Sequence, residues 1–325
     1  MSELRFALLG AGGQGAHHAR LMRETGRGVL AALCDANEAV LQRRQEEFGG
    51  VRAYRDLEAL LAGEKLDAVV IATPHTQHYE QVKRCLEHGL HVLSEKPLAT
   101  TAAHARALAQ LAADKGRILA IAYQRHGDRL FRTGRKLLQE GVIGEIKLTH
   151  SIIAQDCLAN FIPGRTWRAD PALSGGGHLM DTGSHVIDIL LWMTGLEPKR
   201  VHAFINQHET HVDVLSALSI EYTNGAVGTL AATSLSPEWR EEHTFYGTEG
   251  TLYVRGEGVQ YRRFGEEAVT VTELDGAGQP PILNFIDAVQ KGAEVQAPAV
   301  CGIRVAQLTN TAYRSAESGR VEDVG

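Results

Sequence analysis

Hydrophobic residues in the first 124 positions form short runs that alternate with longer segments of mixed polarity. Fully apolar runs such as Ala68-Val-Val-Ile-Ala72 are typical of strands covered on both faces. The longer segments carry apolar residues at helical spacing, and three of them end at Gly49, Gly89 or Gly116, where glycine suits a helix terminus. This alternation predicts βαβ units and a parallel sheet. The predicted strands are 4–9, 29–34, 52–54, 68–72, 91–94 and 118–122, and the clearest helices are 37–48, 78–88 and 102–115.

The pattern changes after residue 124. A predicted helix over 128–140 precedes a predicted strand over 145–154, an irregular stretch with three consecutive glycines, and a helix over 181–193. From Val201 onward strand patterns dominate, and the Asn-Gly pair of Thr223-Asn-Gly-Ala226 predicts a hairpin. We therefore predict an α/β domain in residues 1–124 and an α+β domain, built on antiparallel strands, in residues 125–325.

Composition narrows the possible partners and compartment. The 325 residues include 33 Lys and Arg against 39 Asp and Glu, so the net charge of -6 disfavours nucleic acid and anionic membranes as partners. No apolar run is long enough to span a bilayer, and the first residues lack the pattern of a secretion signal. The four cysteines lie far apart, without a C-x-x-C pair. We expect a cytoplasmic protein.

A glycine motif follows the first predicted strand. Gly10-Ala-Gly-Gly-Gln-Gly15 ends that strand and opens a helical segment, which is the position that a dinucleotide-binding motif requires. Gly10 would allow the tight turn, Gly12 would let the backbone approach the pyrophosphate, and Gly15 would permit close packing of helix on strand. The phosphates would then lie at the positive end of the helix.

Asp35 indicates which dinucleotide is bound. It ends the second predicted strand, 20 residues after Gly15, where a carboxylate accepts hydrogen bonds from the ribose hydroxyls. A carboxylate there repels a 2′-phosphate, so we predict NAD as the cofactor and NADP as the less favoured one. The alternative role of Asp35, as a helix cap, could be served equally well by Asn37. Arg43 and Arg44 lie two helical turns away and are expected to face solvent.

Lys96 lies in Ser94-Glu-Lys-Pro97, directly after the strand over 91–94. It therefore emerges at the carboxyl end of a strand, which is the edge where open α/β sheets bind ligands. A single lysine is more often a solvated surface charge, but here the following proline stiffens the turn.

Four motifs, in this order, resemble those of the glucose-fructose oxidoreductase / inositol dehydrogenase / MocA (Gfo/Idh/MocA) family. They are Gly10-Ala-Gly-Gly-Gln-Gly15, Ala72-Thr-Pro-His-Thr-Gln-His78, Glu95-Lys-Pro97 and Gly176-Gly-His-Leu-Met-Asp-Thr-Gly-Ser-His185. The resemblance extends to the late segment Tyr246-Gly-Thr-Glu-Gly-Thr-Leu252. It implies an N-terminal Rossmann domain that binds NAD, followed by a domain for substrate binding and oligomerisation with a large, mostly antiparallel open sheet.

The resemblance also implies a set of site residues. Lys96 would be the catalytic lysine, with Glu95 near the nicotinamide ribose and the Lys96-Pro97 bond commonly cis. His75 departs from the family pattern, since many members carry asparagine there, and His78 would equally suit a polar helix start. The residues expected to contact the cofactor are Gly10, Gly12, Gly13, Gln14, Gly15, Asp35, Thr73, His75, His78, Glu95, Lys96, Trp167 and Arg168.

Asp181 and His185 lie four residues apart at the start of a predicted helix, so their side chains project from one face. On spacing alone, Asp181 could simply cap the helix and His185 could be a core histidine. A metal site that adds Asp188 is disfavoured because no further ligands cluster nearby, so no metal is predicted. The cluster His208-Glu-Thr-His211 is expected at the surface. The resemblance implies instead that Asp181 and His185 face the nicotinamide together with Lys96.

Trp167-Arg168 is similar to a pair that contacts cofactor or substrate in some members of the family. From the residues alone, Trp167 could be a core aromatic and Arg168 the partner in a salt bridge. The segment Gln124-Arg-His126, which follows the last strand of the first predicted domain, has no assigned role.

These expectations define an NAD-dependent dehydrogenase of a secondary alcohol on a sugar, sugar derivative or cyclitol. Its substrate would contact Lys96, Arg168, Asp181 and His185, with His185 taking the hydroxyl proton and Lys96 stabilising the developing negative charge. Two alternatives are an NAD-dependent glycosidase that oxidises its substrate transiently and a non-catalytic NAD-binding sensor or regulator. An exposed apolar sheet face would favour a homodimer or homotetramer.

Overall fold

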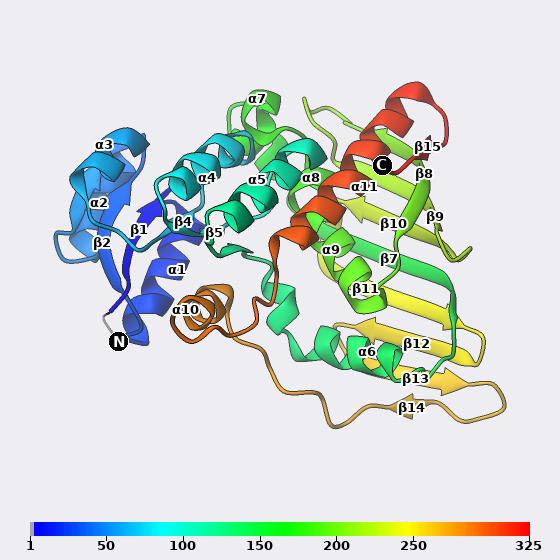
Figure 1. Cartoon of the computed structure of the whole chain (residues 1–325). Helices are drawn as coiled ribbons and strands as arrows, with labels where there is room; N and C mark the ends of the chain where they lie inside the picture. Colours follow the sequence, from blue (N-terminus) through cyan, green and yellow to red (C-terminus); the bar gives the residue numbers. More distant parts are fainter. Residues whose placement is uncertain (1–2) are drawn as a thin grey trace. The chain divides into compact units, whose positions relative to one another are not determined.

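A computed structural model describes residues 3–325 (Figure 1). The chain forms two compact units. The first contains the described residues up to Gln124 together with Gln279–Ile303, and the second contains Arg125–Gly278 and Arg304–Gly325. The expected single boundary after residue 124 therefore does not hold for Gln279–Ile303. This segment returns to the first unit because Ile282, Phe285 and Ile286 complete its hydrophobic core.

The first unit is built on a six-stranded parallel sheet in the order β3-β2-β1-β4-β5-β6, as far as the described residues show. Its strands are β1 (Arg5–Leu9), β2 (Val29–Cys34), β3 (Arg52–Tyr54), β4 (Ala68–Ile71), β5 (His91–Ser94) and β6 (Leu119–Ile121). Every residue of β4 is buried, as its uninterrupted apolar pattern predicts. The predicted parallel sheet is thus confirmed.

Helices connect these strands. They are α1 (Gly13–Glu24), α2 (Glu38–Glu47), α3 (Leu57–Gly63), α4 (His78–Glu87), α5 (Ala102–Asp114) and the returning α10 (Pro281–Lys291). Gly49, Gly89 and Gly116, which follow α2, α4 and α5, all have positive φ angles of 60° to 83°. Glycine adopts this conformation without a steric penalty, which explains why these helices stop where the sequence predicts.

The second unit is built on a nine-stranded sheet in the order β14-β13-β12-β11-β7-β10-β9-β8-β15, counting the residues that the structure describes. Among the described strands of this sheet only β7 and β10 pair in parallel, so the predicted, mostly antiparallel sheet is confirmed. The predicted hairpin joins β9 to β10, with Gly225 at φ +82°. The strands are β7 (Ile146–Asp156), β8 (Pro198–Asn206), β9 (Leu215–Tyr222), β10 (Val227–Thr233), β11 (Leu235–Gly247), β12 (Gly250–Arg255), β13 (Gly258–Arg263), β14 (Val269–Thr270) and β15 (Glu322–Asp323).

One face of this sheet is covered by helices, as the second unit in Figure 1 shows. α8 packs on β9 and β10, α9 on β7, and α6 on β12 and β13. The helices are α6 (Arg129–Gln139), α7 (Pro171–Ser174), α8 (His178–Asp181), α9 (Gly183–Thr194) and α11 (Ala299–Ser318), of which α11 contains the boundary after Ile303.

The strand pattern expected from Val201 onward did not predict α10 and α11. In α11 the residues Val305, Thr309 and Thr311 favour a strand locally, yet all three are buried in the helix. Among the described residues, no helix combines the length and the apolar character needed to cross a membrane.

The buried carboxylate of Asp287 connects α10 to the rest of the first unit. It forms an ion pair with Arg27, which precedes β2, and accepts hydrogen bonds from Gln279 at 2.7 Å and Lys291 at 2.8 Å. The hydrogen bond from the Arg27 guanidinium, supported by Lys291, holds the pKa of Asp287 well below its usual range. A carboxylate whose pKa is lower in the folded state stabilises the fold above its unfolded pKa, and this stability is lost as the pH falls through the folded pKa.

We expect Asp287→Asn to lower the free energy of unfolding by about 2 kcal/mol at neutral pH, because it removes a charged acceptor from three donors. The difference from wild type should shrink as the pH falls below about 4, where the carboxyl of the unfolded chain becomes protonated. Urea unfolding at several pH values measures both effects. Asp114→Asn, which changes an exposed carboxylate on α5, serves as the control. An equal loss at acidic and neutral pH would contradict the proposed ionic origin.

Candidate active site

The glycine-rich turn joins β1 to α1 and closely approaches the end of β4. Gly10 has φ +88°, and a Cβ there would lie 2.5 Å from the carbonyl carbon of Ala72. A Cβ at Gly15 would lie 2.1 Å from the oxygen of Gly10, so glycine is required at both positions. At Gly12 and Gly13, by contrast, a Cβ would meet no atom within 4 Å. The turn is therefore closed toward the sheet and open on its other side.

The open side of this turn has the properties of an anion site. α1 begins at Gly13, its N-cap Gly12 provides no side-chain cap, and no acidic residue lies in the first turn. The backbone N–H groups there carry the positive end of the helix dipole without a side chain of the helix to satisfy them. A pyrophosphate therefore fits this end of α1, as the sequence motif predicts.

Asp35 lies at the carboxyl end of β2, against the same turn. Its Oδ2 accepts a hydrogen bond from the N–H of Ala11 and its Oδ1 accepts one from the N–H of Asn37, each at 2.9 Å. The N-cap of α2 is Asn37, which accepts from Val40, so Asp35 is not needed as the cap. A carboxylate can accept about four hydrogen bonds, which leaves capacity for ribose hydroxyls.

Arg44 corrects one expectation. Arg43 is exposed as predicted, but Arg44 lies on the inner face of α2 and is only 8% exposed. Its Nε donates to the oxygen of Ala11 at 3.0 Å, and its guanidinium forms an ion pair with Glu47. Arg44 was expected to face solvent, but packing against the glycine-rich turn places it, with Leu41, on the buried side of the helix.

The loop after β4 carries Thr73, His75 and His78. Thr73 donates its hydroxyl to Gln81 at 2.5 Å, and His75 is buried. His78 is fully buried, with Nδ1 2.7 Å from the oxygen of Pro97 and Nε2 2.9 Å from the oxygen of Thr73. Both partners are carbonyls, which can only accept, so only an imidazolium would donate to both. Burial lowers the pKa of His78 and opposes that charge. His78 thus links the loops after β4 and β5, and its expected contact with the cofactor stays a prediction.

The turn after β5 carries Lys96. The peptide bond from Lys96 to Pro97 is cis, in agreement with the family resemblance. The N–H of Glu95 donates to Ile71 of β4 at 2.8 Å, which ties the turn to the neighbouring strand. Glu95 Oε1 lies 2.9 Å from His18 Nε2, and His18 belongs to α1. Although burial raises the pKa of Glu95, the hydrogen bond and charge of His18, together with Lys96, lower it overall.

The second unit brings Trp167, Arg168 and Asp181 together. Arg168 donates from Nε to Asp181 Oδ2 at 2.6 Å, and its guanidinium lies 4.5 Å from the centre of the Trp167 ring. Asp181 ends α8 and His185 lies in the first turn of α9, with Thr182 between them in a helical conformation. Both side chains are largely buried, at 7% and 8% exposure. The sequence predicted one helix over 181–193, whereas the structure divides this segment into α8 and α9, with Thr182 in a helical conformation between them.

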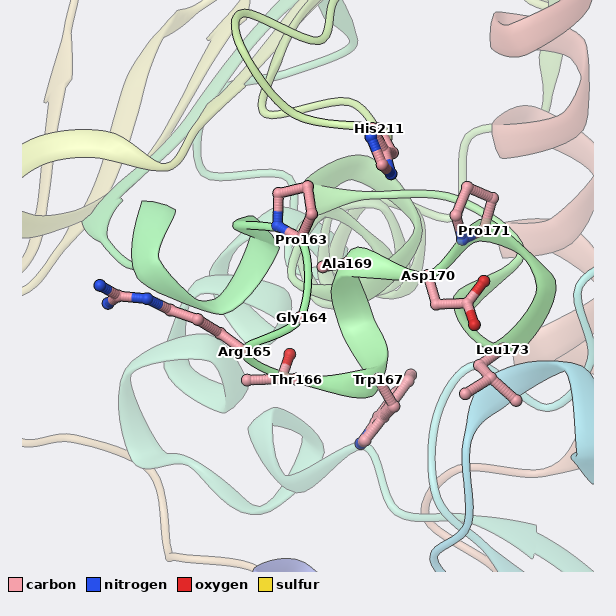
Figure 2. A pocket seen from close by; sticks show the side chains of 10 residues that line it. All are labelled: Pro163, Gly164, Arg165, Thr166, Trp167, Ala169, Asp170, Pro171, Leu173 and His211. Atoms are coloured by element: carbon pink, nitrogen blue, oxygen red, sulfur yellow. The ribbon is translucent and has the colours of Figure 1, made fainter.

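A pocket of the second unit adjoins this group (Figure 2). Trp167 and Asp170 line it together with Pro163 and His211, and in this view His211 lies across the pocket from Trp167. His208 and His211 are exposed, in agreement with the predicted surface position of their cluster.

Two matches with known families follow the two predicted regions. Residues 4–123 match the "Oxidoreductase family, NAD-binding Rossmann fold", and residues 131–253 match the "GFO/IDH/MocA C-terminal domain". The chain belongs to the Gfo/Idh/MocA oxidoreductase family. Membership is consistent with the glycine-rich turn, the Lys96-Pro97 turn and the open antiparallel sheet, each of which the structure contains.

Several members of the family are similar over nearly the whole chain. D-glucoside 3-dehydrogenase of Escherichia coli (strain K12) is 29% identical, over 99% of this chain and 98% of that protein. Inositol 2-dehydrogenase of Rhizobium meliloti (strain 1021) is 26% identical, over 98% of each. The WlbA dehydrogenase from Bordetella pertussis, solved in complex with NADH and UDP-GlcNAcA, is 25% identical with a TM-score of 0.89, over 100% of this chain and 99% of that one.

Asp213 is a structurally important residue of this family member that the sequence pattern did not reveal. Its carboxylate is buried and accepts hydrogen bonds from the N–H groups of Gly177 and Leu179, each at 2.7 Å, and from the Tyr313 hydroxyl at 2.6 Å. Burial raises the pKa of Asp213, while the three donors oppose this shift. Asp213 therefore fixes the start of α8, the helix that ends with Asp181. An aspartate between two valines was the only signal in the sequence.

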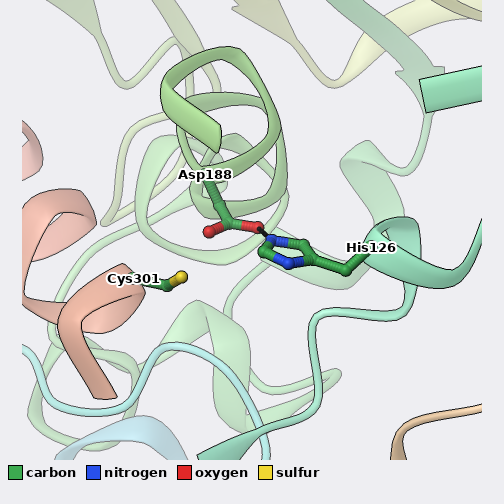
Figure 3. Close-up of side chains that lie close together, drawn as sticks. All are labelled: His126, Asp188 and Cys301. Atoms are coloured by element: carbon green, nitrogen blue, oxygen red, sulfur yellow. Dashed lines mark hydrogen bonds and ion pairs between the residues drawn. The ribbon is translucent and has the colours of Figure 1, made fainter. Parts of the chain in front are cut away.

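Asp188 and the segment after residue 124 also have partners within the second unit. His126 Nε2 lies 2.7 Å from Asp188 Oδ2, and both side chains are buried (Figure 3). The His126 ring packs 4.4 Å from Trp192, and Arg125 donates two hydrogen bonds to Glu241, both at 2.6 Å. Asp188, which the sequence raised as a companion of His185, is thus paired with His126 instead.

We expect Gly177→Ala to destabilise the second unit by about 1 to 3 kcal/mol, because its Cβ would lie 1.9 Å from the backbone oxygen of Asp213. Thermal and urea unfolding measure the loss. Gly256→Ala is the matched control, since a Cβ there meets nothing within 4 Å and its φ is not positive. Equal stability of the two variants would show that the backbone at Gly177 can move away without cost.

Proposed function

We propose that this protein is an NAD-dependent dehydrogenase that transfers a hydride between a secondary alcohol of a sugar, sugar derivative or cyclitol and nicotinamide. The observation that carries the proposal lies within the first unit. The turn that bears Lys96 is bonded through Glu95 to His18 of α1, the helix whose N-terminus fits a pyrophosphate. The backbone of Lys96 is therefore connected to the helix of the proposed dinucleotide site.

Each half of the cofactor has candidate partners. The turn Gly10-Ala-Gly-Gly-Gln-Gly15 would hold the pyrophosphate and Asp35 the adenosine ribose, with Thr73, His75 and Glu95 on the nicotinamide side. NAD supplies, when bound, a hydride acceptor for the carbinol carbon.

The reaction also requires removal of the hydroxyl proton. We assign His185 as the group that accepts this proton, since imidazole exchanges protons near neutral pH. The Lys96 ammonium would stabilise negative charge on the oxygen as the proton leaves. Asp181, held by Arg168, would orient the substrate through its carboxylate, and Trp167 would support Arg168. For reduction of a ketone the same groups would act in reverse.

The substrate class is supported by the relatives. Their names refer to a glucoside, an inositol and, in the WlbA complex, a sugar nucleotide. All of these ligands offer neighbouring hydroxyls, which suit a site with ammonium, carboxylate and imidazole groups. We therefore extend the class, and not any one compound, to this protein.

NAD is proposed as the preferred cofactor because the Asp35 carboxylate would repel the 2′-phosphate of NADP. Arg44 lies against the same turn, but its charge is paired with Glu47. The balance between the negative charge of Asp35 and the paired positive charge of Arg44 would set the preference for NAD over NADP.

We also propose that the protein forms a homodimer or homotetramer through the uncovered face of the second sheet. On this face Val227, Leu148 and Tyr246 are neighbours across β10, β7 and β11, and each is at least 37% exposed. Phe204 of β8 is 72% exposed. A second copy of the chain would remove this apolar surface from water.

Formation of NADH from a panel of polyols, cyclitols and glycosides tests the proposed activity directly. With the best substrate, Lys96→Ala should lower kcat by about a hundredfold or more, because the charge that stabilises the alkoxide is lost. NADH binding, followed by fluorescence, should change far less. Lys115→Ala, at an exposed position after α5, is the control. Wild-type turnover in Lys96→Ala, or substrate conversion without net NADH, would overturn the proposed reaction.

The cofactor preference is tested by Asp35→Asn, which keeps one oxygen acceptor, for Ala11 or Asn37, and removes the charge together with the other acceptor. We expect the ratio of kcat/KM for NAD to that for NADP to fall by about tenfold, the effect of about 1.4 kcal/mol of electrostatic repulsion. Asp56→Asn is the matched control, because Asp56 caps α3 after the neighbouring strand β3. An unchanged ratio would assign the preference to groups other than Asp35.

A further inference from the structure

His18 forms a bond that neither the glycine motif nor the Lys96 motif predicts. It lies on α1, three residues after Gly15, and is 4% exposed. Its Nε2 is 2.9 Å from Glu95 Oε1, and the Glu95 side chain is 14% exposed. Both residues belong to the first unit. The bond thus joins the helix of the proposed pyrophosphate site to the residue that precedes Lys96.

The tripeptide from Glu95 to Pro97 is held by an imidazole on each side. His18 bonds to the Glu95 carboxylate, and His78 contacts the oxygen of Pro97 at 2.7 Å. The second oxygen of Glu95 accepts from the N–H of Lys96 at 3.3 Å. The Glu95 carboxylate therefore connects His18 directly to the backbone of the lysine. Any movement of this carboxylate would be transmitted to Lys96.

Loss of the bond would leave a buried carboxylate without its main side-chain partner. Such a group tends to turn toward other donors or toward water, since burial of an unpaired charge is costly. For Glu95 one such donor is Lys96, whose charge already acts on the carboxylate. The lysine turn would then rearrange while the glycine-rich turn, held by its own backbone contacts, would stay in place.

We propose that His18 is a positioning residue for the dehydrogenase reaction, acting on Lys96 through the Glu95 carboxylate. This inference rests on the proposed function. In this role His18 touches neither the substrate nor the reacting atoms. It fixes the distance between the cofactor helix and the lysine, and a displacement of about 1 Å at a reacting group can cost about a hundredfold in rate.

Two variants that differ by one methylene test the proposal. His18→Gln carries an amide N–H near the position of Nε2 and should keep most of the wild-type kcat. His18→Asn is too short to reach Glu95, so its kcat should fall by about tenfold to a hundredfold. KM for the alcohol and the dissociation constant of NADH should remain close to wild type in both. His17→Asn, at the exposed neighbouring position on α1, is the control.

A double-mutant cycle separates positioning from general damage to the fold. Glu95→Ala removes the carboxylate, and combining it with His18→Asn should lower kcat no further than Glu95→Ala alone, because His18 acts through Glu95. Additive losses would overturn the proposal, as would equal kcat values for His18→Gln and His18→Asn. If His18→Asn unfolds, two variants of Glu95 provide the test instead. Glu95→Gln keeps an acceptor for His18 and Glu95→Ala does not, so equal kcat values for these two variants would reject the positioning role. Failure of the proposed function itself is recognised separately, by wild-type turnover in Lys96→Ala.

Discussion

Parallel pairing of β1 with β4, and of β4 with β5, is the constraint on which the first unit depends. The residues that follow parallel strands meet at one edge of the sheet, so Gly10, Thr73 and Glu95 become neighbours although they are far apart in sequence. The close contact of Gly10 and Gly15 with the end of β4 then fixes where α1 begins. The contacts proposed for the pyrophosphate and the nicotinamide depend on this arrangement of strand ends.

Three buried histidines of this protein connect separate segments. His18 joins α1 to the lysine turn, His78 joins the loops after β4 and β5, and His126 pairs with Asp188. Each of these rings is buried and bonded to oxygen. A buried histidine close to the proposed site is therefore not by itself evidence of a catalytic role. The assignment of His185 as the proton acceptor rests on its place in the family motif.

One buried carboxylate in each unit holds the backbone near the candidate site residues, Glu95 in the first unit and Asp213 in the second. The two carboxylates have different hydrogen-bond partners. Glu95 is paired with an imidazole, whereas Asp213 is surrounded by two backbone N–H groups and the Tyr313 hydroxyl. Burial raises the pKa of Asp213, while the charges beside Glu95 lower the pKa of that residue. In both cases a short segment is held by a side chain distant in sequence. His18 holds the turn at Glu95, and Asp213 holds the segment from Gly177 to Leu179.

Local pattern predicted the six strands of the first sheet and, through its motifs, the family, but it did not predict α10 and α11. The alternation of apolar runs and helical segments predicted the parallel sheet. Asn-Gly predicted the hairpin between β9 and β10, because the pairing of two strands joined by a short turn depends on residues close in sequence. Motif spacing identified the glycine-rich turn and the place of Lys96 after β5. Tertiary structure alone decided that Gln279–Ile303 returns to the first unit, that Arg44 packs on Ala11, and that His18 and Asp213 support the turns after β5 and before α8. These contacts join residues up to hundreds of positions apart, and they depend on side-chain packing and charge pairing that no local periodicity records.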